Sequence, residues 1–588
     1  MTIQAVFNVA EICAQHGITD VVLSPGSRSA PLTLAFARHP ALTVRVVPDE
    51  RAAAFIGLGI AQAQRRAVAL VCTSGTAGLN YAPAVAEAFF QHIPLVIFTA
   101  DRPPEWIDQL DGQTIRQRNL YGAHAKGEFE FPVDTSHADA KWHSARIVNE
   151  AINLAQAAPA GPVQVNVPLR EPFYPKAGEE VGYEKDVKII QTLQDACFPA
   201  TQELKSLVSE FNAAPRVLLV FGQQPRQPWH DEFELSAQND RDNYVAVADI
   251  ISNVNQQNEG CYSIINLHDV FLAGATATLK EALQPALLIT CGQSLISKSL
   301  KQFLRRFPAA QHWHIQPAGP VADTFGQLTK IIRADPSEFI PELLKKVQHT
   351  EAQPLELRNQ RSNFRQSWAA SEIAAYKLLR KEVYSFEHVP FNEFSIFGLL
   401  LHWVQQETAL HLANSMAVRY ANILSLPQGE ERNIEVFANR GTSGIDGCNS
   451  TAVGAALAQP NRPVVLLTGD VAFFYDRNAF WHNYPTPNLR VVLFNNHGGG
   501  IFRIIDGPRQ QPELDEFFET RQTLTAENTA RDFGLRYFPV SSFEELEAAL
   551  PVFFAPDGGA AILEVMTDSR TNAAFFEQYR AAVKQAFA

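Results

Sequence analysis

Short runs of apolar residues recur along this chain, and stretches with helical spacing separate them. Five such runs lie in the first 180 residues, at 19–27, 41–50, 66–75, 93–103 and 161–169. Four more lie at 216–222, 244–250, 286–292 and 311–317, and a third set lies at 409–415, 434–441, 463–470, 489–496 and 560–567. Strands that alternate with helices build parallel sheets covered by helices on both faces. The sequence therefore predicts an α/β protein with three consecutive doubly wound parallel-sheet domains.

The stretches between the three sets set the expected domain boundaries. We expect domains at 1–185, 200–345 and 366–588, with the polar segment around 346–366 as a linker or a crossing helix. Within the first domain, helices are expected at 52–64 and 79–91. In such sheets, ligands gather at the carboxyl ends of the strands. The loops that follow the predicted strands are therefore where a functional site is expected.

Charge and composition exclude several kinds of partner and compartment. The net charge is −13, and no basic block stands out, so neither nucleic acid nor a membrane surface is an expected partner. No run of about 18 apolar residues predicts a transmembrane helix. The six cysteines show no C-x-x-C spacing, which favours a reducing compartment over a disulfide framework. We expect a cytoplasmic protein.

Oxygen-bearing side chains follow two of the strands predicted in the third domain. Asp470 ends the run at 463–470, and Asn496 precedes the glycine run that includes Gly498. A carboxylate, an amide oxygen and a backbone carbonyl are hard ligands that suit Mg²⁺, or Mn²⁺ in its place. Such an ion usually binds phosphate oxygens as well, so a phosphorylated partner is expected. The structural alternative is a helix cap at Asp470 followed by an ordinary loop.

The pair Gly469–Asp470 followed by Asn495–Asn496 resembles the cofactor signature of thiamine diphosphate-dependent enzymes, with Val471 where that family usually has another glycine. The segment 439–458 is similar to the family's cofactor segment, in which a helix amino end can face the diphosphate. The resemblance implies that Ile445 is the bulky residue beneath the bent cofactor, although it could equally be a core contact. The cofactor contacts that it implies are Glu50, Ser415, Ser443, Gly444, Ile445, Gly469, Asp470, Val471, Asn496 and Gly498.

Glu50 is the candidate acid beside the pyrimidine ring of that cofactor. It precedes a predicted helix, and residues 73–80, TSGTAGLN, resemble the family's pyrimidine-domain segment. The resemblance implies a pyrimidine domain at 1–185, a middle domain, and a diphosphate- and metal-binding domain at 366–588. It also implies a homodimer or a dimer of dimers, in which two chains share each active site. Without the resemblance, Asp49 and Glu50 would be a solvated helix start stabilised by the helix dipole.

Arginines recur at the predicted strand ends. They are Arg28, Arg102, Arg116, Arg419 and Arg440, with Ser27 and Gln113 nearby. The planar guanidinium binds carboxylates with two parallel hydrogen bonds, so several of them indicate a substrate set with more than one carboxylate. Each one alone could instead form a loop salt bridge.

Six motifs together narrow the resemblance: SPGSRSAPL (24–32), TADRPPE (99–105), IRQ (115–117), ANSMAVR (413–419), NRGTSGIDG (439–447) and NNHGGGIF (495–502). They resemble the synthases of menaquinone biosynthesis that use thiamine diphosphate to join 2-oxoglutarate to isochorismate. The implied reaction is decarboxylation of 2-oxoglutarate and conjugate, Stetter-like addition of the resulting succinic semialdehyde carbanion to isochorismate. Ser299 stands where that family often has an arginine, and Lys301 is a possible replacement. The implied substrate contacts are Ser27, Arg28, Arg102, Gln113, Lys298, Arg419, Arg440, Ile501, Phe502 and Ile505, of which the last three form an apolar wall or simply core.

Two other functional classes stay open from the sequence. One is another thiamine diphosphate-dependent 2-oxo acid decarboxylase or an acetolactate synthase-like carboligase, which would not need the arginines. The other is a non-catalytic binding or regulatory subunit with the same fold, against which the presence of Glu50, Asp470 and Asn496 argues. In the middle domain, the pair His312 and His314 is expected to lie at the surface without binding metal.

Overall fold

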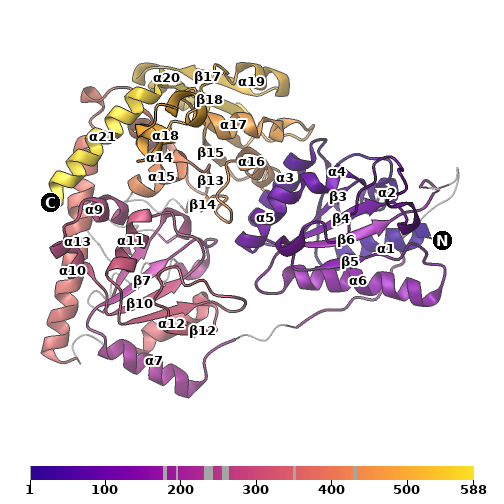
Figure 1. Ribbon diagram of the computed structural model, residues 1–588, viewed down its shortest axis with the longest axis horizontal. Helices are drawn as coiled ribbons and strands as arrows, with labels where there is room; N and C mark the ends of the chain where they lie inside the picture. The colour runs from indigo at the N-terminus through magenta and orange to yellow at the C-terminus, as the bar shows by residue number, and fades with distance from the viewer. Residues whose placement is uncertain are drawn as a thin grey trace.

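A computed structural model describes residues 2–171, 173–175, 182–193, 197–230, 233, 243–254, 264–347, 353–427 and 433–588. The described residues form three six-stranded sheets, all parallel, with helices on their faces (Figure 1). The expected α/β class with three doubly wound sheets is confirmed. The strands of the three sheets lie within 20–168, 217–332 and 409–566, each inside one of the expected domains.

The first and third sheets share one strand permutation. The first has the order β2-β1-β3-β4-β6-β5 and the third the order β14-β13-β15-β16-β18-β17. The middle sheet, β12-β11-β10-β7-β8-β9, has the order of a dinucleotide-binding fold. The chain thus contains two similar domains separated by a different one.

The first domain contains the first sheet, and β6 is the last of its strands in the sequence. Its two expected helices are present with shifted bounds, because α3 starts at Glu50 and the second divides at Tyr81 into α4 and α5. Its elements are α1 (Thr2–Gln15), β1 (Asp20–Leu23), α2 (Ala30–Ala37), β2 (Thr43–Val46), α3 (Glu50–Gln64), β3 (Val68–Cys72), α4 (Thr76–Asn80), α5 (Ala82–Gln91), β4 (Leu95–Asp101), η1 (Pro104–Trp106), η2 (Gly122–His124), β5 (Glu128–Glu130), α6 (Ala138–Gln156) and β6 (Val163–Pro168).

The middle domain is followed by a 28-residue helix, α13, so the polar segment after residue 346 leads into a crossing helix. The elements are α7 (Thr201–Ala213), β7 (Val217–Phe221), β8 (Val245–Ala248), η3 (Ile250–Ser252), β9 (Ile264–Ile265), α9 (His268–Gly274), α10 (Ala277–Leu283), β10 (Leu287–Cys291), α11 (Lys298–Arg306), β11 (Gln311–Ile315), β12 (Lys330–Ile332), α12 (Pro336–Lys346) and α13 (Leu355–Glu382). Helix α13 spans the boundary expected at 366 and packs against α9 and against α21 near the C-terminus. The exact domain limits stay a prediction.

The third domain carries the longest series of elements. They are η5 (Phe386–His388), α14 (Glu393–Trp403), β13 (Ala409–Leu412), α15 (Met416–Leu424), β14 (Glu435–Phe437), α16 (Cys448–Ala458), β15 (Val464–Gly469), α17 (Asp470–Tyr475), η6 (Arg477–Phe480), β16 (Leu489–Asn495), α18 (Ile501–Ile504), η7 (Pro508–Gln510), η8 (Leu514–Phe518), α19 (Glu527–Phe533), β17 (Arg536–Val540), α20 (Phe543–Phe553), η9 (Pro556–Gly558), β18 (Ala561–Met566) and α21 (Ser569–Ala586). Among the described residues, no helix combines the length and the apolar character that a membrane crossing requires.

The expectation of surface histidines in the middle domain is wrong. His312 and His314 lie on one face of β11 and are buried, with 1% and 9% of their surface exposed. The hydroxyl of Thr290 on the neighbouring strand β10 lies 2.9 Å from Nε2 of His312 and 2.8 Å from Nδ1 of His314. Burial lowers the pKa of His312 to about 4. The pair is therefore a neutral, hydrogen-bonded part of the interior.

Helix α3 of the first domain packs closely along α16 of the third (Figure 1). A side chain at Gly59 would overlap the carbonyl oxygen of Thr451, and one at Gly454 would overlap that of Ile56. Glycine at both positions lets the two backbones approach each other. The first and third domains of one chain are thus joined by a tight helix pair.

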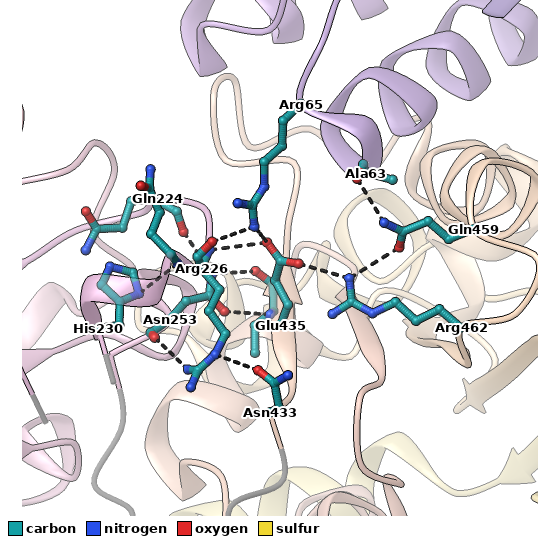
Figure 2. Close-up of polar contacts among 12 residues, drawn as sticks. Ala63, Arg65, Gln224, Arg226, His230, Asn253, Asn433, Glu435, Gln459 and Arg462 are labelled. Carbon is teal, nitrogen blue, oxygen red and sulfur yellow. Dashed lines mark hydrogen bonds and ion pairs between the residues drawn. The ribbon is translucent and has the colours of Figure 1, made fainter. Parts of the chain in front are cut away.

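A second contact joins all three domains at the carboxylate of Glu435, the first residue of β14 (Figure 2). Oε1 accepts hydrogen bonds from Nη2 of Arg65 at 3.0 Å and from the backbone N–H of Arg226 at 3.2 Å. Oε2 accepts one from Nη1 of Arg462 at 3.0 Å. These three partners come from the first, middle and third domains. Glu435 therefore fixes the three domains relative to one another.

We expect Glu435→Ala to lower the free energy of unfolding by about 2 kcal/mol, because Arg462 loses a charged partner in a largely buried place. Arg65 adds little to this cost, since 47% of its side chain is exposed. The midpoint of urea unfolding checks the effect. Glu527→Ala is the matched control, because its ion pair with Arg531 is exposed on both sides. Equal losses in the two variants would contradict the role given to Glu435.

Candidate active site

Asp470 lies where β15 passes into α17, at the carboxyl edge of the third sheet. Its Oδ1 accepts the backbone N–H of Val471 at 2.8 Å. Its Oδ2 accepts the N–H of Gly498 at 2.7 Å and Nε2 of Gln522 at 3.0 Å. Burial raises the pKa of Asp470 to about 6, and these hydrogen bonds offset part of that rise. The predicted metal ligands Asp470 and Gly498 are therefore in direct contact.

Asn496 follows β16, the strand next to β15. Its Nδ2 donates to Oε1 of Glu393 at 2.6 Å, whereas its Oδ1 is buried and has no hydrogen-bond partner. The carbonyl of Gly498 accepts only the N–H of Gly500 at 2.9 Å among the described backbone bonds. A carboxylate, an unpartnered amide oxygen and a carbonyl with a free lone pair fit a hard divalent cation. Within the described ranges no three His, Cys, Asp or Glu side chains form a metal-binding group, and the predicted set contains only one such residue.

Two residues that bond Asp470 and Asn496 were not predicted from the sequence. Glu393, the first residue of α14, is buried, and burial raises its pKa to about 7. Gln522 donates to both Asp470 and Asn495. Glu393 lies far from Asp470 in the sequence, in a segment that resembles an ordinary helix start. Only the sheet and helix packing brings these residues together.

Asn495 has a different role from its neighbour Asn496. Its Nδ2 donates to Oε1 of Glu564 at 2.7 Å and to the carbonyl of Leu524 at 2.9 Å. Its Oδ1 accepts the backbone N–H of His497 at 3.1 Å. Asn495 thus holds the loop in place.

The implied cofactor contact that follows β13, Ser415, lies in a loop that is bonded to the segment after β14, where Ser443, Gly444 and Ile445 are found. Nδ2 of Asn414 donates to the carbonyls of Asn439 and Gly444, at 2.6 and 2.5 Å. Ser415 and Ser443 both adopt positive φ angles, of 74° and 65°. Such angles are costly for residues other than glycine and cluster at functional sites. Ile445 is partly buried and packs against the core of the third domain.

The amino end of helix α16 is bonded by a protein side chain. The buried carboxylate of Asp476 accepts the N–H and the hydroxyl of Ser450, both at 2.7 Å. This contact satisfies one N–H of the first turn of α16, and a diphosphate at this helix end stays a prediction.

Glu50 is half-buried and begins α3, where Asp49 caps the helix by accepting the N–H groups of Arg51 and Ala52. Asp49 is therefore the residue that caps the helix. The carboxylate of Glu50 is left for another role. Burial, followed by the negative charge of Glu50, raises the pKa of Cys72 at the end of β3. Glu50 thus lies near the carboxyl edge of the first sheet, close to the segment 73–80.

Within one chain, the start of α3 contacts the far end of α17. Asp49 accepts a hydrogen bond from Asn478 at 2.8 Å, and the guanidinium of Arg51 lies 5.2 Å from the ring centre of Tyr475. Tyr475 is the last residue of α17, and Asp470 is the first. Glu50 and Asp470 of one chain therefore lie toward opposite ends of this helix.

The predicted arginines form two neighbouring pairs. Burial, followed by the positive charge of Arg102, lowers the pKa of Arg28, and burial, followed by that of Arg419, lowers the pKa of Arg440. Nη1 of Arg440 donates to Oδ1 of Asn414 at 3.0 Å, its Nε is buried without a partner, and Arg419 donates to the carbonyl of Ser415. In the part of the chain that the structure describes, neither Arg419 nor Arg440 forms a salt bridge.

Arg102 and Arg116, by contrast, pair with loop carboxylates. Arg102 pairs with Asp111 at 2.5 Å and Arg116 with Asp108 at 3.0 Å. For these two arginines the alternative interpretation, a loop salt bridge, is therefore what the structure shows. Arg419, which is exposed, and Arg440, which is half-buried, are left as the neighbouring cations beside the cofactor segment.

The remaining substrate candidates are exposed or half-buried. Lys298 is exposed at the start of α11, whereas Lys301 is half-buried and close enough to Arg440 for that arginine to lower its pKa, after the larger effect of burial. Ser27 and Gln113 are exposed on first-domain loops. Half-buried positions on and just after α18 are occupied by Ile501, Phe502 and Ile505.

Comparison with known families agrees with this geometry. Residues 3–121 match the family "Thiamine pyrophosphate enzyme, N-terminal TPP binding domain", and residues 433–565 match "Thiamine pyrophosphate enzyme, C-terminal TPP binding domain". A solved benzoylformate decarboxylase from Polynucleobacter necessarius superposes with a TM-score of 0.70 at 16% identity, over 96% of this chain and 98% of that chain, which shows the shared fold. The protein is by class a thiamine diphosphate-dependent enzyme.

Curated relatives specify the family within that class. The chain is 43% identical to a 2-succinyl-5-enolpyruvyl-6-hydroxy-3-cyclohexene-1-carboxylate synthase of Cytophaga hutchinsonii, over 99% of this chain and 100% of the relative. It is 38% identical to the synthase of that name from Porphyromonas gingivalis (97% and 95% covered) and 35% identical to that from Flavobacterium johnsoniae (97% of each). The chain belongs to this synthase family of menaquinone biosynthesis.

Proposed function

We propose that the protein decarboxylates 2-oxoglutarate and adds the remaining four-carbon unit to the ring of isochorismate, with thiamine diphosphate and Mg²⁺ or Mn²⁺ bound. One observation carries the proposal: the neighbouring guanidiniums of Arg419 and Arg440 lie beside the cofactor segment without a carboxylate partner in the described chain. Arginines that form no salt bridge within the protein are suited to substrates that bring their own carboxylates. Both proposed substrates carry carboxylates.

Each group of residues has a separate task. Asp470, Asn496 and the carbonyl of Gly498 would hold the divalent cation and, through it, the diphosphate. Glu50 would hold a proton against the pyrimidine ring, and Ile501, Phe502 and Ile505 would keep water away from the reacting carbon. Thiamine diphosphate, when bound, supplies the nucleophilic carbon that the protein lacks. The side chains bind, orient and compensate charge.

We propose further that two copies of the chain share each site, in a dimer or a dimer of dimers. In one chain the neighbours of Glu50, Asp49 and Arg51, contact Asn478 and Tyr475 at the end of α17 that lies away from Asp470, which supports a partner's Glu50 serving Asp470. Large apolar side chains are exposed close to both halves of the site. They are Leu79, Phe90, Trp106 and Leu110 in the first domain, and Tyr475, Trp481, Phe517 and Phe518 in the third. Exposed large apolar side chains on both domains support an interface between chains there.

Substrate turnover tests the activity directly. The purified protein with thiamine diphosphate and Mg²⁺ should consume isochorismate only when 2-oxoglutarate is present, with one CO₂ released for each isochorismate lost. Pyruvate in place of 2-oxoglutarate should give little turnover. Efficient use of pyruvate without isochorismate would instead favour an acetolactate synthase-like or decarboxylase activity.

Arg440→Ala should lower kcat/KM about 100-fold, since a charged hydrogen bond to substrate is lost. The affinity for thiamine diphosphate should change little, because the arginine faces the substrates. Steady-state kinetics and cofactor titration measure the two effects. Arg531→Ala removes an exposed arginine of the same domain and should leave both unchanged. Loss of cofactor affinity equal to the loss of kcat/KM would contradict the substrate role.

A further inference from the structure

The orientation of the Asn496 amide decides whether its oxygen can bind a cation. The amide has two nearly isosteric ends, and a half-turn of the group exchanges the oxygen for a nitrogen that cannot bind a cation. In the structure Nδ2 lies 2.6 Å from Oε1 of Glu393, and Oδ1 lies buried without a partner. The site thus depends on whatever selects this orientation.

Glu393 is itself held in place from several directions. Its backbone N–H donates to Oδ1 of Asn572 at 3.0 Å, and its Oε1 also accepts the hydroxyl of Thr567 at 3.3 Å. Asn392 caps the same helix by accepting the N–H of Ser395 at 3.0 Å. The carboxylate therefore cannot readily turn away from Asn496.

In the structure Oε1 of Glu393 accepts from Nδ2 of Asn496, and a carboxylate selects this end of the amide because its oxygens accept hydrogen bonds. Nδ2 must therefore face Glu393, and Oδ1 must point away from it. A Cβ at Gly500 would lie 2.8 Å from Nδ2 and 3.3 Å from Oδ1, so glycine at this position leaves the amide the room it needs. Contacts of this kind around metal ligands fix ligand geometry.

We propose that Glu393 is the positioning residue that locks the Asn496 amide with its oxygen available to the divalent cation. This inference rests on the proposed cation site. It concerns a residue outside the predicted ligand set, contributed by a helix that precedes the sheet of the third domain.

Binding of Mn²⁺ to the apoprotein in the presence of thiamine diphosphate, followed by electron paramagnetic resonance at pH 8, tests the proposal without turnover. Glu393→Gln keeps the size of the side chain but allows either orientation of Asn496, so the Kd for Mn²⁺ should rise about 10- to 100-fold. Glu372→Gln is the matched control. Glu372 is equally buried, and its hydrogen bonds go to the backbone N–H groups of Asn266 and Leu267 in the middle domain. It should leave the Kd unchanged.

A double variant separates positioning from general damage to the fold. In Glu393→Gln/Asn496→Asp, the new amide donates to the new carboxylate, and the hydrogen bond returns with its polarity reversed. Asn496→Asp alone places two carboxylates against each other. The double variant should therefore bind Mn²⁺ at least about tenfold more tightly than Asn496→Asp alone, which is a coupling that only contacting residues show.

The outcomes test the cation site and the positioning role of Glu393 separately. If the unaltered protein does not bind Mn²⁺, the proposed cation site fails. If it binds Mn²⁺ and Glu393→Gln binds equally well, or if Asn496→Asp matches the double variant, the positioning role is refuted while the cation site stands.

Discussion

Replacing Glu50 by Gln should reduce turnover by about 10²- to 10⁴-fold, the range expected when a positioned acid is removed. The carboxyl group exchanges a proton with the pyrimidine ring in the proposed mechanism, whereas the amide can only hydrogen bond. The side chain keeps its size, so the cofactor should still bind with nearly its normal affinity. Measuring kcat together with the Kd for thiamine diphosphate separates these effects.

Asp49→Asn is the matched control for Glu50→Gln. Asp49 is the adjacent carboxylate, but it caps α3 and contacts Asn478. Its replacement should lower the thermal midpoint while leaving most of the turnover. The assignment of Glu50 would be wrong if Glu50→Gln retained near-normal kcat.

Asp470→Ala should weaken Mn²⁺ binding by more than about 100-fold, because it removes the only carboxylate among the predicted ligands. Bound cation and cofactor stabilise only the folded protein, so the rise in melting temperature on adding Mg²⁺ and thiamine diphosphate should disappear as well. Thermal unfolding with and without the two additives checks this prediction.

Asp476→Asn provides the comparison, since Asp476 follows the same short helix and is buried, but bonds Ser450. This variant should be less stable and still show the ligand-induced rise. If Asp470→Ala kept that rise in full, the cation would have to bind elsewhere.

All strands inside the sheets were found from the sequence, together with the edge strands β2 and β14. Parallel strands with covered faces read as continuous apolar runs, as in Val464–Gly469 and Leu489–Asn495. The missed strands β5, β9, β12 and β17 all lie at sheet edges. They are short, or carry charges and proline, as in Glu128–Glu130 and Arg536–Val540. These four edge strands have weaker apolar patterns than the covered strands, so their residues alone do not reveal them.

The candidate site was predictable where the metal-binding groups belong to short motifs in the sequence. Asp470, Asn496 and Gly498 follow adjacent strands, and the structure brings them together. Glu393 and Asp476 were not predictable, because their roles depend on which helix end packs against which loop. The burial of His312 and His314 was missed for the same reason, since an i, i+2 pair looks identical on a covered and an uncovered face.

The central claim is that each active site combines the first domain of one chain with the third domain of another. Co-expressing Glu50→Gln and Asp470→Ala chains with different affinity tags yields hybrid dimers for purification. If two chains share each site, one site of the hybrid carries both defects and the other carries neither, so about half of the wild-type turnover should return. If each site lies within one chain, every site is defective, and turnover no higher than that of the two parent variants would contradict the account.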